Sequence, residues 1–215
     1  MYTPTDILET EAEVEAMLGP VFPSQINKII DHIDLHCQTW IERSPDMALS
    51  TADALGNIDV SPRGDPPGFV KVLDPHTLAV PDRPGNNRGD TFRNLLQNPA
   101  IGLMFMVPQR REVVRVRGKA VICRDAELLE TMAIKGRVPL LALVVRVEAA
   151  FFHCGKAAIR SGLWTPEAWA DPSGLPSYAE ALLDHGKPPL TLDELEARTR
   201  FNEGERLYDD PERAS

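Results

Sequence analysis

The stretch EVVRVRGKAVIC, residues 112–123, alternates apolar and polar side chains over much of its length. Successive side chains of an extended strand point to opposite faces. Val114 and Val116 therefore fall on one face, and Arg115 and Arg117 fall on the other. This pattern predicts a strand that places one face on a core and the other toward solvent.

Strand signals of a similar kind flank this stretch on both sides. They are MALSTAD (47–53), NIDVSP (57–62), GFVKVLD (68–74), TLAV (77–80), AIGLMFMV (100–107) and LLALVVRVEAAFFHC (140–154). AIGLMFMV is apolar throughout, which predicts a strand buried on both faces. Short turns and the absence of a regular strand–helix alternation predict a mainly β chain with peripheral helices, folded as an antiparallel split β-barrel.

Helices are predicted outside and between these strands. Ser24 can cap a helix over residues 25–43, and Phe92, Leu95 and Leu96 form one face of a short helix that Pro99 ends. Further helices are expected over residues 125–134 and 191–204. The predicted organisation is an N-terminal helical segment (1–45), a barrel domain (46–170) and a C-terminal arm or helix (171–215).

Composition narrows the possible functions. The chain has 215 residues and a formal net charge of -9, which disfavours binding to nucleic acid or to an anionic membrane. Its three cysteines lie far apart without CxxC spacing, so we expect neither a disulfide framework nor a zinc ribbon. The first residues lack a signal-peptide pattern, and no apolar run is long enough to span a bilayer. We expect a cytoplasmic protein.

The segment VPDRPGNNRGDTFRNLLQNP, residues 80–99, is a candidate anion site. Arg88, the Asn86 and Asn87 amides and the N–H groups at a helix start near Asp90 could together hold a phosphate. Two alternatives stay open. The residues could simply build a turn, or the Asp90 carboxylate could cap the helix and satisfy the same donors.

Two other pairs of residues have spacings found in functional sites. His32 and His36 have the i, i+4 spacing of metal ligands but lack a third partner, which favours an exposed polar helix face. His153 and Cys154 are adjacent on a predicted strand and would point to opposite faces, which argues against a nucleophile–base pair. We expect no metal site, and the sequence identifies no catalytic side chain.

The order of segments from Met47 to Trp169 resembles the FMN-binding split-barrel flavoproteins of the pyridoxamine 5'-phosphate oxidase-like superfamily. The resemblance rests on a hairpin, the Arg-bearing segment VSPRGDPPG (60–68), a second strand, the Asn-Arg loop and the NP that precedes a buried strand. The segment FFHCGKAAIRSGLWTPEAW (151–169) resembles the C-terminal signature of one FMN-dependent subgroup.

The resemblance implies an FMN site shared by the two subunits of a homodimer. It assigns Asn87 and Arg88 to the phosphate loop and makes Arg63 a second cation for the phosphate or ribityl region. Strand edges at Ser61 and at Pro81, Asp82 and Arg83 would hold the isoalloxazine ring through backbone groups. The partner would supply Lys156, Arg160, Ser161 and Trp164, whereas Arg115 and Arg117 are weaker candidates.

The resemblance also implies an FMN-dependent oxidoreductase that acts on a small organic molecule, with electrons from a nicotinamide or from the substrate. The flavin itself carries the redox chemistry, so the absence of a catalytic triad does not count against an enzyme. The alternative is a flavin carrier or sensor without turnover. The chain ends in LTLDELEARTRFNEGERLYDDPERAS and lacks the Arg- and Trp-rich ending of true pyridoxamine phosphate oxidases, so we do not expect oxidation of vitamin B6.

Overall fold

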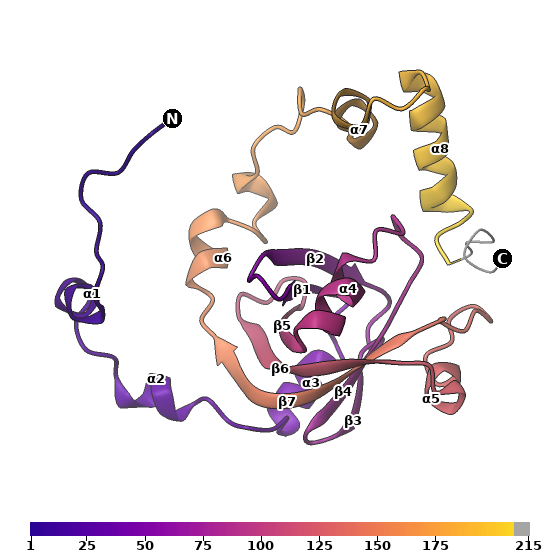
Figure 1. Ribbon diagram of the computed structural model, residues 1–215. Coiled ribbons are helices and arrows are strands. Elements are labelled where there is room, and N and C mark those ends of the chain that lie inside the picture. Colours follow the sequence, from indigo (N-terminus) through magenta and orange to yellow (C-terminus); the bar gives the residue numbers. More distant parts are fainter. Residues whose placement is uncertain (209–215) are drawn as a thin grey trace.

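The computed structural model describes residues 1–208 and has one antiparallel sheet as its body. Seven strands follow the order β2-β1-β5-β6-β7-β4-β3, and the sheet curls into a barrel with helices around it (Figure 1). The predicted fold class, mainly β with peripheral helices, is confirmed. Residues 209–215 of the predicted C-terminal arm lie outside the described part of the chain.

The strands lie close to the predicted stretches. They are β1 (Asp46–Ala52), β2 (Ile58–Gly64), β3 (Lys71–Asp74), β4 (Thr77–Pro81), β5 (Ala100–Met106), β6 (Val113–Cys123) and β7 (Ala142–His153). On β6, Val114 and Val116 are buried while Arg115 and Arg117 are exposed, as the alternation predicts.

The two longest strands, β6 and β7, pair from Val113–His153 at one end to Cys123–Ala142 at the other. Their register shifts between Arg117 and Gly118, where β7 carries an extra residue. Such a bulge increases the local twist and bend of a sheet. Gly118 is required there, because a Cβ atom at this position would lie 2.0 Å from the Arg146 carbonyl oxygen.

Eight α-helices and one 3-10 turn occur in the described residues, mostly at the periphery. They are α1 (Glu11–Leu18), α2 (Pro23–Asn27), α3 (Leu35–Ile41), α4 (Asp90–Gln97), α5 (Ala126–Glu130), α6 (Lys156–Ser161), η1 (Pro166–Ala168), α7 (Tyr178–Gly186) and α8 (Leu192–Gly204). None of these helices is long and apolar enough to cross a membrane. Cys37 and Ile41 of α3 are buried in the barrel core.

The single helix predicted for residues 25–43 is wrong. The backbone of Ile30 pairs with Ala150 of β7, which takes this segment out of helical geometry. Two short helices, α2 and α3, take the place of the single one, and α3 begins after Asp34, whose carboxylate accepts a hydrogen bond of 2.8 Å from the Cys37 N–H. An aspartate in that position is a usual helix-capping signal.

Three further expectations need correction. β5 is buried on one face only, since its burial alternates along the strand and Gly102, Met104 and Met106 are half-buried. Leu96 is 79% exposed and does not join Leu95 on the core face of α4. The helix predicted for residues 125–134 ends at Glu130; the next backbone bonds, from Thr131 to Ala133, are i→i−3 turn bonds, and Lys135 and Gly136 then have positive φ.

We predict that Gly118→Ala destabilises the fold by about 2 to 3 kcal/mol, because the added methyl group must push against the β7 backbone. Urea unfolding measures the change. Gly102→Ala is the matched control, because its Cβ would meet the nearest atom, Ser50 Cβ, only at 3.9 Å. Equal free energies of unfolding for the two variants would contradict the role of the bulge.

Candidate functional site

A hollow of about 660 Å³ opens between the edge strand β2, the loop before α4 and the residues before β7. Its lining consists of residues 59–63, Asp82, Arg83, residues 85–92, Leu140 and Leu141. The predicted residues Ser61, Arg63, Asp82, Arg83, Asn87 and Arg88 thus lie together in one place. Pro81 ends β4 immediately before this lining.

The strand β2 supplies one wall through the two-residue period of a strand. Asp59, Ser61 and Arg63 are half-buried, and the residues between them are exposed. β2 lies at the edge of the sheet, where Pro62 is tolerated because one side of an edge strand donates no ladder hydrogen bonds. The alternation along β2 therefore places three polar side chains on the same face of the strand, those of Asp59, Ser61 and Arg63.

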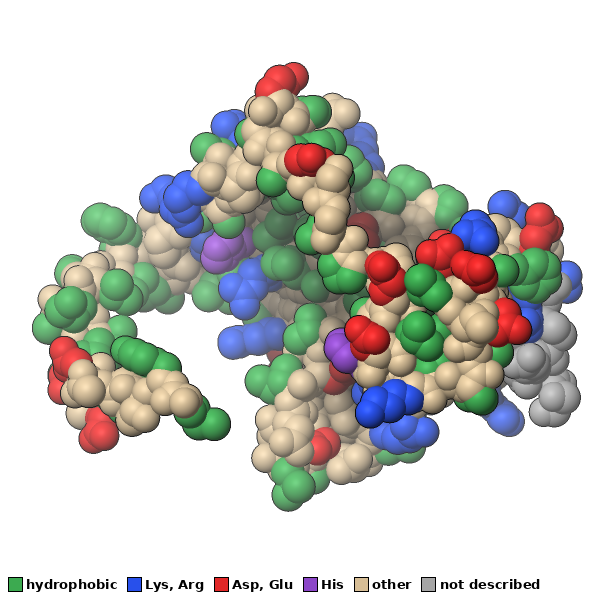
Figure 2. Space-filling model, turned by 90° about the horizontal axis from the view of Figure 1, so that it is seen from above, with side chains coloured by type: hydrophobic (Ala, Val, Ile, Leu, Met, Phe, Trp, Pro, Cys, Tyr) green, Lys and Arg blue, Asp and Glu red, His purple; other side chains and the backbone are tan. Residues whose placement is uncertain are grey.

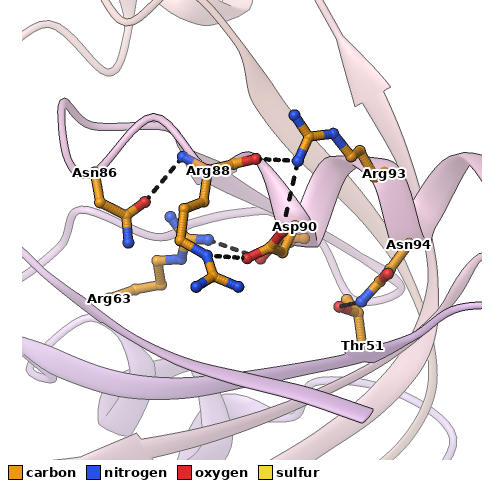
Figure 3. Close-up of polar contacts among 8 residues, drawn as sticks. Thr51, Arg63, Asn86, Arg88, Asp90, Arg93 and Asn94 are labelled. Atoms are coloured by element: carbon orange, nitrogen blue, oxygen red, sulfur yellow. Dashed lines mark hydrogen bonds and ion pairs between the residues drawn. The ribbon is translucent and has the colours of Figure 1, made fainter. Parts of the chain in front are cut away.

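Arg63 connects three separate segments. Its Nη2 donates a hydrogen bond of 2.9 Å to Thr91 Oγ1 at the start of α4. Its Nη1 lies 3.8 Å from Asp82 Oδ1, just after β4. The Asp82 and Thr91 side chains are buried, so this guanidinium is held in a fixed position. Figure 3 shows Arg63 and Arg88 reaching toward the start of α4 from the strand and from the loop.

The loop before α4 has an unusual backbone. Asn87 and Gly89 have φ values of 56° and 68°, in the left-handed region that asparagine and glycine tolerate best. The Asn86 side chain accepts a hydrogen bond of 3.1 Å from the Arg88 N–H, which tightens the turn. The sequence places these residue types where the backbone requires them.

Asp90 does not cap α4, which settles one of the alternatives. Gly89 is the N-cap residue and makes no side-chain capping bond. The Asp90 carboxylate instead pairs with Arg88 Nε at 2.6 Å and with Arg93 Nη1 at 3.6 Å. The hydrogen bond and charge of Asp90 raise the pKa of Arg88. Because no side chain caps α4, the N–H groups of its first turn remain available to another acceptor.

Two buried polar side-chain atoms of residues that line this hollow have no hydrogen-bond partner among the described residues. They are Ser61 Oγ and Arg63 Nε. Buried polar groups are rarely left unpaired, since an unmade hydrogen bond costs about 1–3 kcal/mol. Two such atoms side by side on one strand fit a site whose ligand brings its own acceptors and donors. A phosphate with an attached polyol chain has that chemistry.

Arg83 lines the hollow but its guanidinium is engaged elsewhere. Arg83 Nε donates to Asp65 Oδ2 at 2.5 Å, and Nη2 donates to the Met132 carbonyl at 2.9 Å. Side-chain exposure is 17% for Arg83 and 1% for Asp65. Arg83 therefore fixes the wall of the hollow through its side chain.

The second predicted group lies away from this hollow. Lys156, Arg160 and Ser161 are exposed on α6, and Trp164 follows α6 with its Nε1 donating 2.8 Å to the Arg110 carbonyl. None of the four lines the hollow within one chain. Their placement at a partner's site stays a prediction.

Arg115 and Arg117 line a different depression of about 410 Å³ on the outer face of the sheet. The Arg115 guanidinium lies 5.1 Å from the centre of the Phe151 ring. His32 pairs with Asp31 rather than with His36, and residues 1–208 contain no group of three or more His, Cys, Asp or Glu side chains that could hold a metal ion.

Comparison with known proteins identifies the family of this chain. Residues 33–154, more than half of the chain, match the profile described as Pyridoxamine 5'-phosphate oxidase. The chain belongs to the pyridoxamine 5'-phosphate oxidase family. The matched region of this family member contains the whole lining of the hollow. A search of curated proteins found no match.

Several solved structures are similar to this family member. HupZ from Group A Streptococcus has 21% identity and a TM-score of 0.46, covering 56% of this chain and 93% of its own. An FMN-binding protein from Syntrophomonas wolfei has 16% identity and a TM-score of 0.42, covering 54% and 82%. HutZ, a heme storage protein from Vibrio cholerae, has 16% identity and a TM-score of 0.41, covering 57% and 94%.

Sequence reasoning missed some residues of the site. Thr91, Leu140 and Leu141 also line the hollow, and Thr91 accepts the Arg63 hydrogen bond. Thr91 could have been found from the sequence, because it lies one residue after the predicted helix start, next to the predicted phosphate loop. Leu140 and Leu141 gave none, because only the pairing of β7 with β4 brings them to Asp82.

We predict that Arg83→Ala lowers the free energy of unfolding by about 3 kcal/mol, because it leaves the buried Asp65 carboxylate without its cation. Arg88→Ala should change stability much less, since the Arg88–Asp90 pair is exposed to solvent, which screens it. Chemical denaturation of both variants tests this. The double variant Arg83→Ala/Asp65→Ala should recover part of the loss, and equal stability of the two single variants would contradict it.

Proposed function

We propose that this protein binds FMN in the hollow and is an FMN-dependent oxidoreductase acting on a small organic molecule. The supporting observation is the pair of unpartnered buried atoms, Ser61 Oγ and Arg63 Nε, in a cation-bearing hollow of a chain from this family. FMN offers a phosphate and a ribityl chain, which match a guanidinium and a hydroxyl. No second phosphate-binding turn of the GxGxxG type occurs, so FAD is not expected.

The phosphate would bind at the start of α4. Arg88 and Asn87 would contact it from the loop, together with the N–H groups that Gly89 leaves uncapped. A dianionic phosphate competes well with a single carboxylate for a guanidinium, so Arg88 would share or exchange its Asp90 partner. Arg63 would contribute a fixed positive charge at low entropic cost, because Thr91 and Asp82 already position it.

The remaining lining would hold the rest of the cofactor. Ser61 Oγ would donate to or accept from a ribityl or ring atom, and the backbone of Pro81–Arg83 would border the isoalloxazine ring. Phe92, Leu140 and Leu141 add apolar surface to the same lining. Bound flavin supplies two-electron redox chemistry, and the chain needs only to bind, orient and electrostatically tune it.

We further propose that the functional unit is a homodimer with a shared site. α1 and α2 have no buried residue within this chain, although they and their neighbours carry Val14, Met17, Leu18 and Phe22. Exposed apolar surface of this extent usually marks an interface. Figure 2 shows this N-terminal arm standing off the body, with Lys and Arg side chains projecting into the space between them.

The position of α6 also supports sharing of the site. A Cβ on Gly155 would lie 2.5 Å from Arg111 Cβ, so α6 begins in close contact with the β5–β6 turn. Trp164 holds its other end to the Arg110 carbonyl. Lys156 and Arg160 are thus presented on a fixed, exposed helix, as residues aimed at a second copy would be.

All three cysteines are unpaired, which favours a reducing compartment, and we propose that the protein is cytoplasmic.

Purified protein should carry one FMN per subunit, and mass spectrometry of the released cofactor identifies it. Arg88→Ala should weaken FMN binding by roughly 30- to 150-fold through loss of a charged phosphate contact. Arg83→Ala should weaken it less, because its guanidinium is bound to Asp65. Released FAD, or protein that cannot be reconstituted with FMN, contradicts the proposal. Bound flavin that no nicotinamide or other donor reduces anaerobically would favour a carrier or sensor.

A shared site predicts complementation between two defective variants. Arg88→Ala disables the hollow, and Lys156→Ala/Arg160→Ala disables the partner's contribution. After subunit exchange, each heterodimer has one intact site, so bound FMN should rise toward about a quarter of the wild-type amount. A mixture that binds no more FMN than the separate variants, or a monomer that holds FMN, argues for a site within one chain.

A further inference from the structure

Four segments far apart in the sequence meet beside the hollow. Tyr208, the last described residue of the C-terminal arm, donates a hydrogen bond of 2.7 Å to Asp65 Oδ1 in the turn after β2. The other Asp65 oxygen accepts from Arg83, which lines the hollow. Lys135, from the turn before β7, lies over the Tyr208 ring with its Nζ 5.2 Å from the ring centre.

This contact is stronger than an ordinary surface hydrogen bond. The Asp65 side chain is 1% exposed, and hydrogen bonds to charged acceptors are about twice as strong as neutral ones. The hydrogen bond to Asp65, followed by desolvation, raises the pKa of Tyr208. The phenol therefore remains a donor throughout the neutral pH range. The ring is also held by the Lys135 ammonium.

In the described residues the arm runs from α6 to Tyr208, and it is fastened at its start as well. It leaves the barrel at α6, where Gly155 and Trp164 fix it to the turn after β5. Residues 165–178 between these ends are exposed, and α7 and α8 pack on each other. Figure 1 shows the arm passing from α6 through α7 and α8 in a wide arc, on the side of the barrel that carries β2 and α4.

We infer that the C-terminal arm is a strap, closed by Tyr208 on Asp65, that gates passage of the cofactor into and out of the hollow. This inference rests on the proposed function, because the gated molecule is FMN. The fastening lies beside the hollow, because the Asp65 carboxylate that accepts from Tyr208 also accepts from the wall residue Arg83. Release of Tyr208 frees one end of the strap while the Arg83–Asp65 pair keeps the wall in place.

A gate and a binding contact have different kinetic signatures. Opening a gate accelerates association and dissociation of FMN by the same factor and leaves the dissociation constant unchanged. Loss of a direct contact raises the dissociation rate alone and weakens affinity. The two roles of Tyr208 can therefore be separated by measuring both rates.

The test compares Tyr208→Phe with wild type by stopped-flow measurement of FMN binding and release. Tyr208→Phe removes the hydroxyl and keeps the ring. Both rates should rise by about tenfold, a typical effect of losing one hydrogen bond to a charged group. The dissociation constant should stay within about twofold, since rates that change together cancel. Tyr178→Phe is the control, because Tyr178 is 65% exposed at the start of α7, and it should leave both rates unchanged.

Limited trypsin digestion gives a second readout that needs no flavin. Arg198 and Arg200 lie in α8 and Arg206 lies between α8 and Tyr208, and Tyr208→Phe should speed cleavage at these three sites. Cleavage at the wild-type rate, unchanged FMN kinetics, or weaker affinity with unchanged association would each overturn the inference. Wild-type protein that binds no FMN contradicts the proposed function and with it the gating role, whereas faster cleavage would still establish the fastening.

Discussion

The pairing of β6 with β7 is the constraint from which the rest of the arrangement follows. These strands run side by side along their whole length, and each takes a further partner on its free edge, β5 on one side and β4 on the other. The bulge at Gly118 bends the pair, so the sheet curls rather than lying flat. This curvature brings β2 and the end of β4 close enough for Arg63 and Asp82 to meet.

Arg63 then ties these ends together. It reaches from an edge strand to the start of α4 and to the residue after β4, which are segments that share no ladder hydrogen bonds with β2. One guanidinium with five donors in a rigid plane can serve several acceptors at once. Two of its nitrogens are used within the chain, while the buried Nε has no partner among the described residues. The same side chain thus closes the fold locally and retains binding capacity.

The two ends of the described chain show how a small barrel is extended. The N-terminal arm carries apolar side chains that its own barrel does not cover, whereas the C-terminal arm returns to the barrel at Tyr208. The difference has a physical cause. An apolar segment gains stability only where another apolar surface excludes water, whereas a tyrosine hydroxyl gains it at a buried carboxylate such as Asp65.

The sequence by itself determined the strands, the turn residues of the anion loop and the alternation of β6, because these depend on local periodicity and on the backbone preferences of Asn, Gly and Pro. It also placed Ser61, Arg63, Asn87 and Arg88 at one candidate site through the family resemblance. Only the tertiary structure decided that Ile30 leaves the helix to pair with β7, that Asp90 pairs with Arg88 instead of capping α4, and that Arg83 turns to Asp65. Each of these outcomes depends on a partner distant in sequence or on a choice between competing acceptors, which no local pattern encodes.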